Sequence, residues 1–471
     1  MSQKTRWLLV IIMLLAVWLR LPGLFANTFH GDEALFASWA RLIAVWRDPL
    51  LQTQLVDKPP LLFYLQALFY PLQGAVEWAA RLPNWILSLL LIPLMGQWVW
   101  RWYEDERAAL LAAALLALSP FAIQFSPTAF LDPALTFWLI ASLTLIDRPG
   151  WSGLLFGLAL LTKHQAWLFL PLLLIIGWVR HRPDLTELSN LSGRWFVRWL
   201  AGMVPMLALL LCWELGRTGS LALWGLQVGN FGGTRLIWSW ELWPRLQAWL
   251  ALGQMVWAGG WLGLLLLLFT LLGSGWLWWQ GHLLDRWLIL FSGSYLAIHW
   301  LLAIPVWDRY LLLLLPIFSL LLARSVLAVA GARYRYGLVV GLVLLLGLGA
   351  WNGRFAHFPI GGQPEADQGI GQLVSHLEDA PYGTVLYDHY HSWQWRYHLF
   401  DKRVHLSWLP HPAHLTEELH VFGQDGHARY LALPTGPAAL PLRRAVTEAN
   451  FCLTLIDQTE AIELQLIQPC P

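Results

Sequence analysis

Long apolar runs separated by short polar segments dominate the first three quarters of the chain. A hydrocarbon core about 30 Å thick requires about 20 apolar residues per spanning helix, and runs near that length recur between residues 7 and 353. The predicted spans, the fifth of which is short, lie at residues 7–25, 79–100, 107–125, 128–146, 151–163, 165–180, 196–215, 252–272, 286–306, 309–330 and 337–353. The pattern therefore predicts an all-α polytopic membrane domain of about eleven transmembrane helices over residues 1–354.

Residues 27–78 are too polar to be a single span and too long to be a simple connection. The segments 32–46 and 58–72 each carry an apolar stripe, and each begins with charged residues or prolines. This pattern predicts helices that lie in the membrane interface. We therefore expect residues 27–78 to form an outer interfacial loop of the transmembrane domain.

The character of the sequence changes near residue 355, where Gly, Pro, His and Asp become frequent. Alternating helical and strand-like patterns predict a small α/β domain over residues 355–471. The expected elements are a helix near 366–379, a strand at 383–388, a helix at 392–400, a strand at 429–434, a helix at 443–450 and two closing strands within 453–469. Cys452 and Cys470 flank the closing strands, and the disulfide that we expect between them requires an oxidising compartment.

Composition and charge narrow the class of protein. The chain of 471 residues is 57% hydrophobic and 13% charged and contains 33 Trp, a profile far from that of a soluble globular protein. A net charge of +1, without a long Lys/Arg block, excludes nucleic acid as a partner. Three Cys are too few for a disulfide scaffold, and Cys212 lies in an apolar run, where a small buried hydrophobe is expected.

The basic residues of the short loops indicate the orientation of the chain in the membrane. If the N-terminus is cytoplasmic, one side collects most of them: Lys4, Arg6, Arg101, Arg107, Arg148, Arg180, Arg182, Arg194, Arg198, Arg286, Arg324, Arg333 and Arg335. We therefore expect a multi-pass protein of the cell's inner (plasma) membrane, with a cytoplasmic N-terminus and an extracytoplasmic C-terminal domain. The first span lacks a convincing cleavage site and is expected to remain as an anchor.

Two adjacent carboxylates, Asp32 and Glu33, follow the end of the first span. Their simplest role is to cap the next helix, where negative charge also interacts favourably with the helix dipole. Other polar residues stand at or beside the predicted outer ends of spans: Asp57, Lys58, Arg81, Asp132, Lys163, His164, Arg235, Arg309 and Tyr310. Together these residues offer carboxylates for proton transfer or metal binding and cations for an anionic group, which predicts a reaction centre at the outer interface.

Most of these residues also have a structural alternative. Asp132 belongs to an Asp-Pro helix start and could simply cap the fourth span. Arg81 and Arg309 could be anchors in the membrane interface. Lys163 could only mark the end of a short span.

Two segments leave their roles open. Arg235 ends the Gly-rich segment 228–235, which could be a mobile substrate lid or a plain connection. Residues 387–398 are dense in His and Asp, yet their spacing fits no firm zinc pattern. A polar recognition surface or ordinary domain structure is favoured over metal binding in that segment.

Six segments resemble the GT-C membrane glycosyltransferases: HGDEALFASWARLI, DKPPLLFYLQALFY, WAARLPN, TAFLDPALTFW, GLALLTKHQAW and RYLLLLLPIFSLLLA. The nearest group is that of the bacterial aminoarabinose and protein O-mannosyl transferases, which use polyprenyl-phosphate sugars. The resemblance covers about residues 1–335, and the order and spacing of the first acidic residues and the later Lys-Pro-Pro carry most of it. It implies a GT-C-like membrane fold.

The resemblance also implies roles for single residues. Asp32 matches the first-loop Asp that acts as catalytic base, and Glu33 and Asp132 are the alternative carboxylates. Lys58 matches the lysine that contacts the lipid phosphate. Asp57 matches a position that joins a metal site in some members, so a divalent metal ion is the one candidate cofactor. The further candidates for phosphate binding are Arg235, Arg309, Tyr310, Lys163 and Arg81.

The expected function is therefore transfer of a sugar from a polyprenyl-phosphate carrier to a lipid, glycan or protein acceptor at the outer face of the membrane. The alternative is a transporter or flippase that moves lipid-linked sugars without chemistry. Such proteins usually place charges near the bilayer midplane on broken helices and show two similar halves, and neither feature is evident in the sequence. A receptor or assembly scaffold would leave the charged residues at the outer interface unexplained.

Overall fold

The computed structural model describes residues 1–470 except residues 27, 71–75, 182–190, 221, 231–234, 330–334, 364, 365 and 368. The contacts between residues divide the chain into two compact units. Residues 1–26, 42–72 and 78–361 form the first unit, and residues 27–41, 73–77 and 362–471 form the second. The second unit thus includes two short segments that the sequence analysis placed in the outer interfacial loop.

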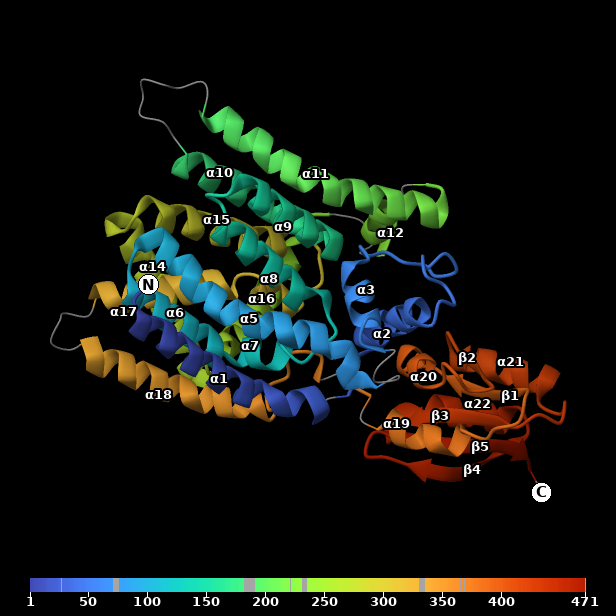
Figure 1. The fold of residues 1–471 in the computed structure, drawn as a ribbon. Coiled ribbons are helices and arrows are strands. Elements are labelled where there is room, and N and C mark those ends of the chain that lie inside the picture. The colour runs from blue at the N-terminus through green and yellow to red at the C-terminus, as the bar shows by residue number, and fades with distance from the viewer. Residues whose placement is uncertain are drawn as a thin grey trace. The chain divides into compact units, whose positions relative to one another are not determined.

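The first unit is built almost entirely of helices (Figure 1). In chain order they are α1 (Gln3–Ala26), α3 (Leu61–Ala67), α5 (Glu77–Tyr103), α6 (Glu106–Leu118), α7 (Pro120–Phe125), α8 (Leu131–Thr144), α9 (Pro149–Thr162), η1 (His164–Phe169), α10 (Leu170–Arg180), α11 (Leu191–Thr218), α12 (Leu223–Asn230), η2 (Ser239–Glu241), α13 (Leu242–Gly253), η3 (Gln254–Val256), α14 (Gly260–Gln280), α15 (Leu283–Leu301), α16 (Arg309–Leu312), α17 (Leu315–Val329) and α18 (Arg335–Arg354). Helix α2 (Gly31–Ala44) begins in the second unit and ends in the first. Helices were therefore found in both segments, 32–46 and 58–72, where the sequence predicted them.

Five helices of the described residues are long and apolar enough to cross a membrane. They are α1, α5 and α14, together with residues 193–218 of α11 and 336–354 of α18. Shorter apolar helices cover residues 131–144, 149–162, 164–180 and 315–329. The chain is a multi-pass membrane protein, and the predicted number of eleven spans is not confirmed.

Prolines divide two of the predicted spans. The predicted span 107–125 is split into α6 and α7 at Ser119, which is extended because the following Pro120 disfavours a helical residue before it. The predicted span 309–330 is split into α16 and α17, and Pro316 stands in the first turn of α17, where its missing N–H is tolerated.

Two glycines displace a third predicted span, 252–272. Gly259 and Gly260 adopt φ values of 76° and 55°, which fall in the left-handed region that side chains with a Cβ atom rarely occupy. They separate the helical segment that ends at Val256 from α14, which begins at Gly260. A Cβ atom on Gly259 would also lie 2.4 Å from the ring of Phe358, so glycine is required by space as well as by conformation.

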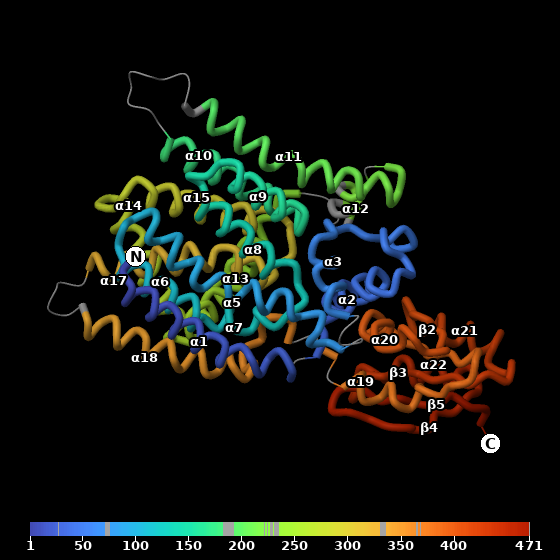
Figure 2. Tube along the Cα trace, viewed as in Figure 1, coloured from blue at the N-terminus to red at the C-terminus, as the bar shows by residue number. Residues whose placement is uncertain are grey.

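Small residues allow α9 and α11 to lie against each other (Figure 2). A Cβ atom on Gly202 of α11 would lie only 2.0 Å from the carbonyl oxygen of Gly150 in α9. A Cβ atom on Gly153 of α9 would lie 1.9 Å from the carbonyl oxygen of Trp199. Helices in membranes commonly associate through such close backbone contacts, because the hydrophobic effect does not hold them together there.

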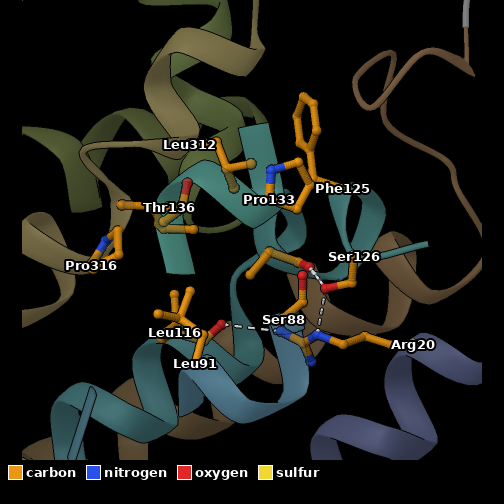
Figure 3. A pocket seen from close by; sticks show the side chains of 12 residues that line it. Arg20, Ser88, Leu91, Leu116, Phe125, Ser126, Pro133, Thr136, Leu312 and Pro316 are labelled. Atoms are coloured by element: carbon orange, nitrogen blue, oxygen red, sulfur yellow. Dashed lines mark hydrogen bonds between the residues drawn. The ribbon is translucent and has the colours of Figure 1, made fainter. Parts of the chain in front are cut away.

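A buried arginine closes the end of α6 (Figure 3). The guanidinium of Arg20, from α1, donates to the carbonyl oxygens of Ala117 at 3.0 Å and Leu116 at 3.3 Å, and to Ser126 Oγ at 3.0 Å. The last carbonyl groups of a helix lack intrahelical donors, so Arg20 caps α6 at its junction with α7. The adjoining cavity, which Thr136 also lines, measures about 20 Å³ and has room for about one water molecule.

The second unit contains a five-stranded sheet with the order β2-β1-β3-β5-β4 (Figure 1). Strands β1 (Thr384–Asp388), β2 (Val404–Trp408) and β3 (Arg429–Pro434) are parallel, whereas β5 (Ile462–Pro469) pairs antiparallel with β3 and with β4 (Phe451–Gln458). The helices of this part are α19 (Ile370–Leu373), η5 (Val374–Leu377), α20 (Ser392–His398), α21 (Pro412–Phe422), η6 (Pro437–Ala439) and α22 (Leu440–Glu448). The C-terminal region therefore has the predicted α/β character.

A separate hydrophobic core lies on each face of this sheet. Leu431 of β3 belongs to one core, with Leu419 of α21 and Leu442 of α22. Its neighbour Ala432 belongs to the other core, with Trp395 of α20. Successive residues of a strand point to opposite faces, so β3 contributes to both cores and the sheet is covered on both sides.

Strand β2 and helix α21 are not predicted by the sequence pattern. The side chains of β2 are all partly or fully exposed, so its sequence lacks the alternation of a half-buried strand. Helix α21 buries only Leu415 and Leu419, which are one helical turn apart and too few to form a clear apolar stripe.

The cysteines give one confirmed prediction and one correction. Cys452 and Cys470 form a disulfide at the ends of β4 and β5, as predicted. Cys212, which was expected to be buried, is exposed on α11. An apolar neighbourhood does not imply burial in a membrane helix, because the side that faces lipid is apolar as well.

Candidate functional site

The residues that the sequence analysis assigned to a reaction centre belong to both units. Asp32 and Glu33 belong to the second unit. The first unit holds the others: Asp57, Lys58, Arg81, Asp132, Lys163, His164, Arg235, Arg309 and Tyr310.

A buried ion pair forms the centre of the first unit's polar residues. Lys163 Nζ lies 2.7 Å from Asp132 Oδ1, and both side chains are at least nine-tenths buried. Asp132 lies in the first turn of α8, but Phe130 occupies the capping position, so the carboxylate serves the ion pair and not the helix end. Lys163 follows the last residue of α9 in an extended conformation. Lys163 thus stands at the end of a short helix, as the structural alternative expected, and in addition pairs with Asp132.

Arg309 and Tyr310, at the start of α16, place a cation and an aromatic ring near this ion pair. The Tyr310 ring centre lies 5.5 Å from Lys163 Nζ. The Arg309 guanidinium lies 4.2 Å from the ring centre of Trp307 and 5.2 Å from that of Phe130. Such cation–π contacts hold a positive charge in a partly dry setting without neutralising it.

A short loop holds the start of α16 in place. The Asp308 carboxylate accepts hydrogen bonds from Arg309 N at 2.7 Å and from Gly361 N at 2.8 Å. The Tyr295 hydroxyl donates to the carbonyl oxygen of Tyr310 at 3.2 Å and accepts from Gln165 Nε2 at 2.8 Å. The hydrogen bonds of Asp308 and of the Tyr295 hydroxyl therefore hold the backbone of Arg309 and Tyr310 in place.

Lys58 belongs to the same charged group as Lys163. Lys58 and Arg309 are both electrostatic neighbours of Lys163, and Lys58 forms its own ion pair with Asp57. Pro60 stands at the start of α3, and the two prolines after Lys58 restrict the backbone there. Lys58, Lys163 and Arg309 thus form a group of three cations, in which Lys58 pairs with Asp57 and Lys163 with Asp132.

Asp57 was the candidate metal ligand. Within the part of the chain that the structure describes, the carboxylates, imidazoles and thiols near Asp57 do not form a group of three potential ligands. Asp57 instead contacts Lys58. A role of Asp57 in metal binding stays a prediction.

Arg81 and Arg235 occupy opposite environments. Arg81 is 1% exposed in α5, so it is not an anchor at the lipid surface. One turn later, Asn84 donates to the carbonyl oxygens of Thr128 at 2.7 Å and Phe130 at 2.6 Å and so ties α5 to the segment before Asp132. Arg235 is 47% exposed and forms an ion pair with Glu241 at 2.8 Å. Half of the Gly-rich segment 228–235, namely residues 231–234, lies outside the described residues.

The two adjacent carboxylates of the second unit differ in their surroundings. Glu33 is 2% exposed, and its Oε2 accepts a hydrogen bond from His30 N at 3.1 Å, which is the contact of a helix-capping residue. Asp32 is partly exposed, and its backbone N–H donates to His30 Nδ1 at 3.0 Å. The capping role expected for the pair is therefore carried by Glu33.

The second unit also contains a polar cluster that the sequence analysis missed. Glu77, Asp367 and His398 offer three ligand atoms that lie within 4.8 Å of one another. Burial disfavours a charged imidazole, but the two carboxylates outweigh this effect and raise the pKa of His398 to about 9. Only His398 comes from the His-rich segment 387–398. The other two residues are distant in sequence, so no local spacing could reveal the cluster.

Comparison with known proteins connects this architecture to a fold. Residues 57–213 match the dolichyl-phosphate-mannose-protein mannosyltransferase family. The crystal structure of ArnT from Cupriavidus metallidurans in the apo state superposes with a TM-score of 0.70 at 15% sequence identity, covering 99% of this chain and 98% of that one. The chain has the GT-C fold.

Two further comparisons give one structural match and one sequence match. The same ArnT bound to undecaprenyl phosphate superposes with a TM-score of 0.66 at 13% identity, covering 98% of both chains. The undecaprenyl phosphate-alpha-4-amino-4-deoxy-L-arabinose arabinosyl transferase of Erwinia tasmaniensis is 25% identical over 204 residues. This match covers 40% of the chain and 37% of the relative, so it spans little more than a third of that protein's length.

Proposed function

We propose that this chain is an integral membrane glycosyltransferase that moves a sugar from a polyprenyl-phosphate carrier to an acceptor at the outer face of the membrane. The observation that carries the proposal is the group of three cations, Lys58, Lys163 and Arg309, set among buried and aromatic side chains on a GT-C fold. The family and relatives named above, whose names include undecaprenyl phosphate or dolichyl-phosphate-mannose, support a lipid-phosphate donor.

The three cations suit the phosphate of a lipid carrier. The tail of such a carrier stays in the bilayer, and its phosphate lies at the interface, where charge pairs count for more than in bulk water. Arg309 can bind phosphate through its N–H edge while its face lies against Trp307. Lys163 and Lys58 contribute positive charge, and Tyr310 and Arg81 are further candidates to contact the phosphate. These cations stabilise the negative charge that develops on the phosphate as the sugar leaves.

Asp32 is the proposed general base. It accepts the proton of an acceptor hydroxyl or amine while that group attacks the anomeric carbon of the sugar. The bond between the anomeric carbon and the phosphate oxygen breaks, and polyprenyl phosphate leaves with the electron pair. Glu33 and Asp132 are poorer candidates, because Glu33 caps α2 and the carboxylate of Asp132 is paired with Lys163.

No step of this proposal depends on a metal at Asp57. The acceptor is a lipid, a glycan or a protein, and the donor sugar is a hexose or a pentose. Membrane lipids surround the multi-pass domain in the inner (plasma) membrane.

The decisive experiment incubates purified protein with a labelled polyprenyl-phosphate sugar, with and without candidate acceptors. The expected result is release of free polyprenyl phosphate that depends on an acceptor, together with transfer of the label to that acceptor. Movement of the intact labelled lipid across a vesicle membrane without its cleavage would contradict the proposal and would favour a flippase.

A further inference from the structure

We propose that Glu77, Asp367 and His398 form a binding site for a divalent transition-metal ion, with Zn²⁺ as the ion that the ligands suit best. All three residues belong to the second unit. They include neither Asp57 nor any other residue of the charged group in the first unit. The two candidate sites therefore share no residue.

Both distances from the His398 imidazole to the carboxylates fit a shared metal ion. His398 Nε2 lies 3.3 Å from Glu77 Oε1 and 3.5 Å from Asp367 Oδ2. Ligand atoms bonded to zinc at ~2.0–2.1 Å in a tetrahedron lie about 3.3–3.4 Å from one another. Imidazole nitrogen and carboxylate oxygen are both regular zinc ligands, and two carboxylates with a neutral imidazole balance the charge of a dication.

Direct hydrogen bonds between His398 and the two carboxylates explain the observed distances less well. Charge-assisted N–H···O bonds measure ~2.7–2.9 Å, which is shorter than either distance from His398 Nε2. A single Nε2 proton also cannot point at two carboxylates at once. Within the described residues, His398 Nε2 and Asp367 Oδ2 are buried atoms that make no hydrogen bond.

Asp367 gives the strongest indication that the cluster binds a cation. This residue is 1% exposed, and Gly369 N donates only to its Oδ1, at 3.2 Å, while Oδ2 faces the cluster. A buried carboxylate oxygen without a donor is costly, and a coordinated cation removes that cost. The side chains of Glu77 and His398 are 21% and 16% exposed, so water can reach the remaining coordination position.

The proposed metal would also hold the backbone that leads into α2. Asp367 N donates to the carbonyl oxygen of Phe29 at 3.1 Å, and the preceding residue, Ala366, forms a β-bridge with His30. Gln394 lies on α20, which also carries His398. When the Gln394 amide is oriented so that its nitrogen donates to the carbonyl oxygen of His391, its oxygen accepts a hydrogen bond from Gly31 N at 3.1 Å. The ion would thus tie together two of the segments that hold the start of α2.

Metal binding can be tested without any turnover assay, so a failure of this proposal is distinct from a failure of the proposed transferase function. Tag-free full-length protein is stripped with chelator and titrated with Zn²⁺ alone, and bound metal is measured after equilibrium dialysis. The wild-type chain is expected to show one tight site that weakens at least ~100-fold in His398→Gln and in Asp367→Asn. A matched control, His376→Gln, removes an imidazole that pairs with Asp457 on the surface of the same unit and should bind like the wild type.

A gain-of-signal variant guards against loss through misfolding. In a Cys212→Ser background, His398→Cys introduces the only thiol, because the other two cysteines are bonded to each other. Co²⁺ is then expected to give the intense visible bands of a tetrahedral site and an added thiolate charge-transfer band. Equal Zn²⁺ affinity in the wild type and His398→Gln, or bound Co²⁺ without the thiolate band, would overturn the proposal.

Discussion

Adjacent residues at the start of α2 are expected to respond differently to the same kind of substitution. Asp32→Asn keeps the size of the side chain but removes its capacity to take a proton, so turnover should fall by ~100-fold or more. Glu33→Gln is the matched control, because its amide oxygen can still accept the hydrogen bond from His30 N. Turnover is measured as acceptor-dependent release of polyprenyl phosphate. A well-folded Asp32→Asn protein with normal turnover would reassign Asp32 to a structural role and make Asp132 the next carboxylate to test.

Lys58 is expected to contribute to donor binding and to the chemical step. Its ammonium pairs with Asp57, and both side chains are largely buried. Lys58→Ala should raise KM and lower kcat, because it removes a cation that the leaving phosphate needs and exposes that phosphate to Asp57. Lys58→Arg should be partly active, since charge survives although geometry changes.

The measurement for Lys58 compares steady-state turnover with inhibition by polyprenyl phosphate. Inhibitor affinity should fall by ~10-fold or more in Lys58→Ala, a loss of about 1.4 kcal/mol. Lys402→Ala, which breaks an exposed ion pair with Glu378, is the control and should change neither quantity. Unchanged inhibitor affinity in Lys58→Ala would move the phosphate site towards Arg309 or Arg235.

Asp388 should make the second unit less stable as pH rises. Burial raises the pKa of Asp388 to about 7, although hydrogen bonds from the backbone of His391 and Tyr390 favour its charged form. In the unfolded chain the same carboxyl ionises near pH 4. Between these values the folded state binds more protons, so this group's contribution to stability decreases from about pH 4 to about pH 7.

Asp388→Asn should remove this pH dependence while keeping an acceptor oxygen for His391 N. From pH 5 to pH 7, the free energy of opening β1 in the wild type should fall by about 2 kcal/mol more than in the variant. Hydrogen exchange of residues 384–388 in the full-length protein measures this opening free energy at each pH. Asp379→Asn, which alters an exposed carboxylate of the same unit, is the control. Parallel pH profiles for wild type and Asp388→Asn would contradict the prediction.

At the scale of elements, the contact between α9 and α11 depends on a missing side chain. Gly202→Ala would place a methyl group 2.0 Å from the carbonyl oxygen of Gly150, which forces the two helices apart. We expect this substitution to lower the midpoint of thermal unfolding by several degrees. Gly193→Ala is the control within the same helix, because no atom of the described residues lies within 4 Å of its Cβ position. Replacing a helical glycine by alanine favours the helix by up to about 1 kcal/mol, and this gain is the same in both variants. Equal unfolding midpoints for Gly202→Ala and Gly193→Ala would therefore show that α9 and α11 adjust without strain.

Elements with a strong local pattern were predictable, and their boundaries depended on single residues. Strand β3, with its buried alternating faces, was predicted at its observed position. Spans divided at Ser119 or displaced at Gly259 were predicted as continuous, because the apolar pattern runs through both breaks. Strand β2 is too exposed to leave a pattern at all. Local sequence therefore indicated what most segments become, and isolated prolines and glycines decided where they end.

The candidate site shows the same limit for side chains. Sequence position identified Asp132, Lys163 and Arg309 as polar residues near the ends of apolar runs. It could not show that Asp132 and Lys163 pair with each other, because the pair joins α8 to the end of α9. The cluster of Glu77, Asp367 and His398 was missed for the same reason, since tertiary structure alone brings its members together.

For the whole molecule, the disulfide offers a direct test of orientation. The C-terminal domain is predicted to be extracytoplasmic, and Cys452 and Cys470 are bonded. In spheroplasts of cells that express a Cys212→Ser chain, an impermeant thiol reagent should label the protein only after an impermeant reductant has been added. Labelling that requires permeabilised cells would place the domain in the cytoplasm. Labelling before reduction would show that the disulfide is absent in the cell.

The make-up of the second unit has a consequence during synthesis. His30 and Phe29 leave the ribosome early, yet their partners Ala366 and Asp367 are made only after every helix of the first unit. Until then, the segment that carries Asp32 lacks the contacts that hold it in place. A chain that stops before residue 366 contains every helix of the first unit but lacks the residues that hold the start of α2. If the chain acts as proposed, an unfinished copy should therefore not cleave the lipid-linked sugar.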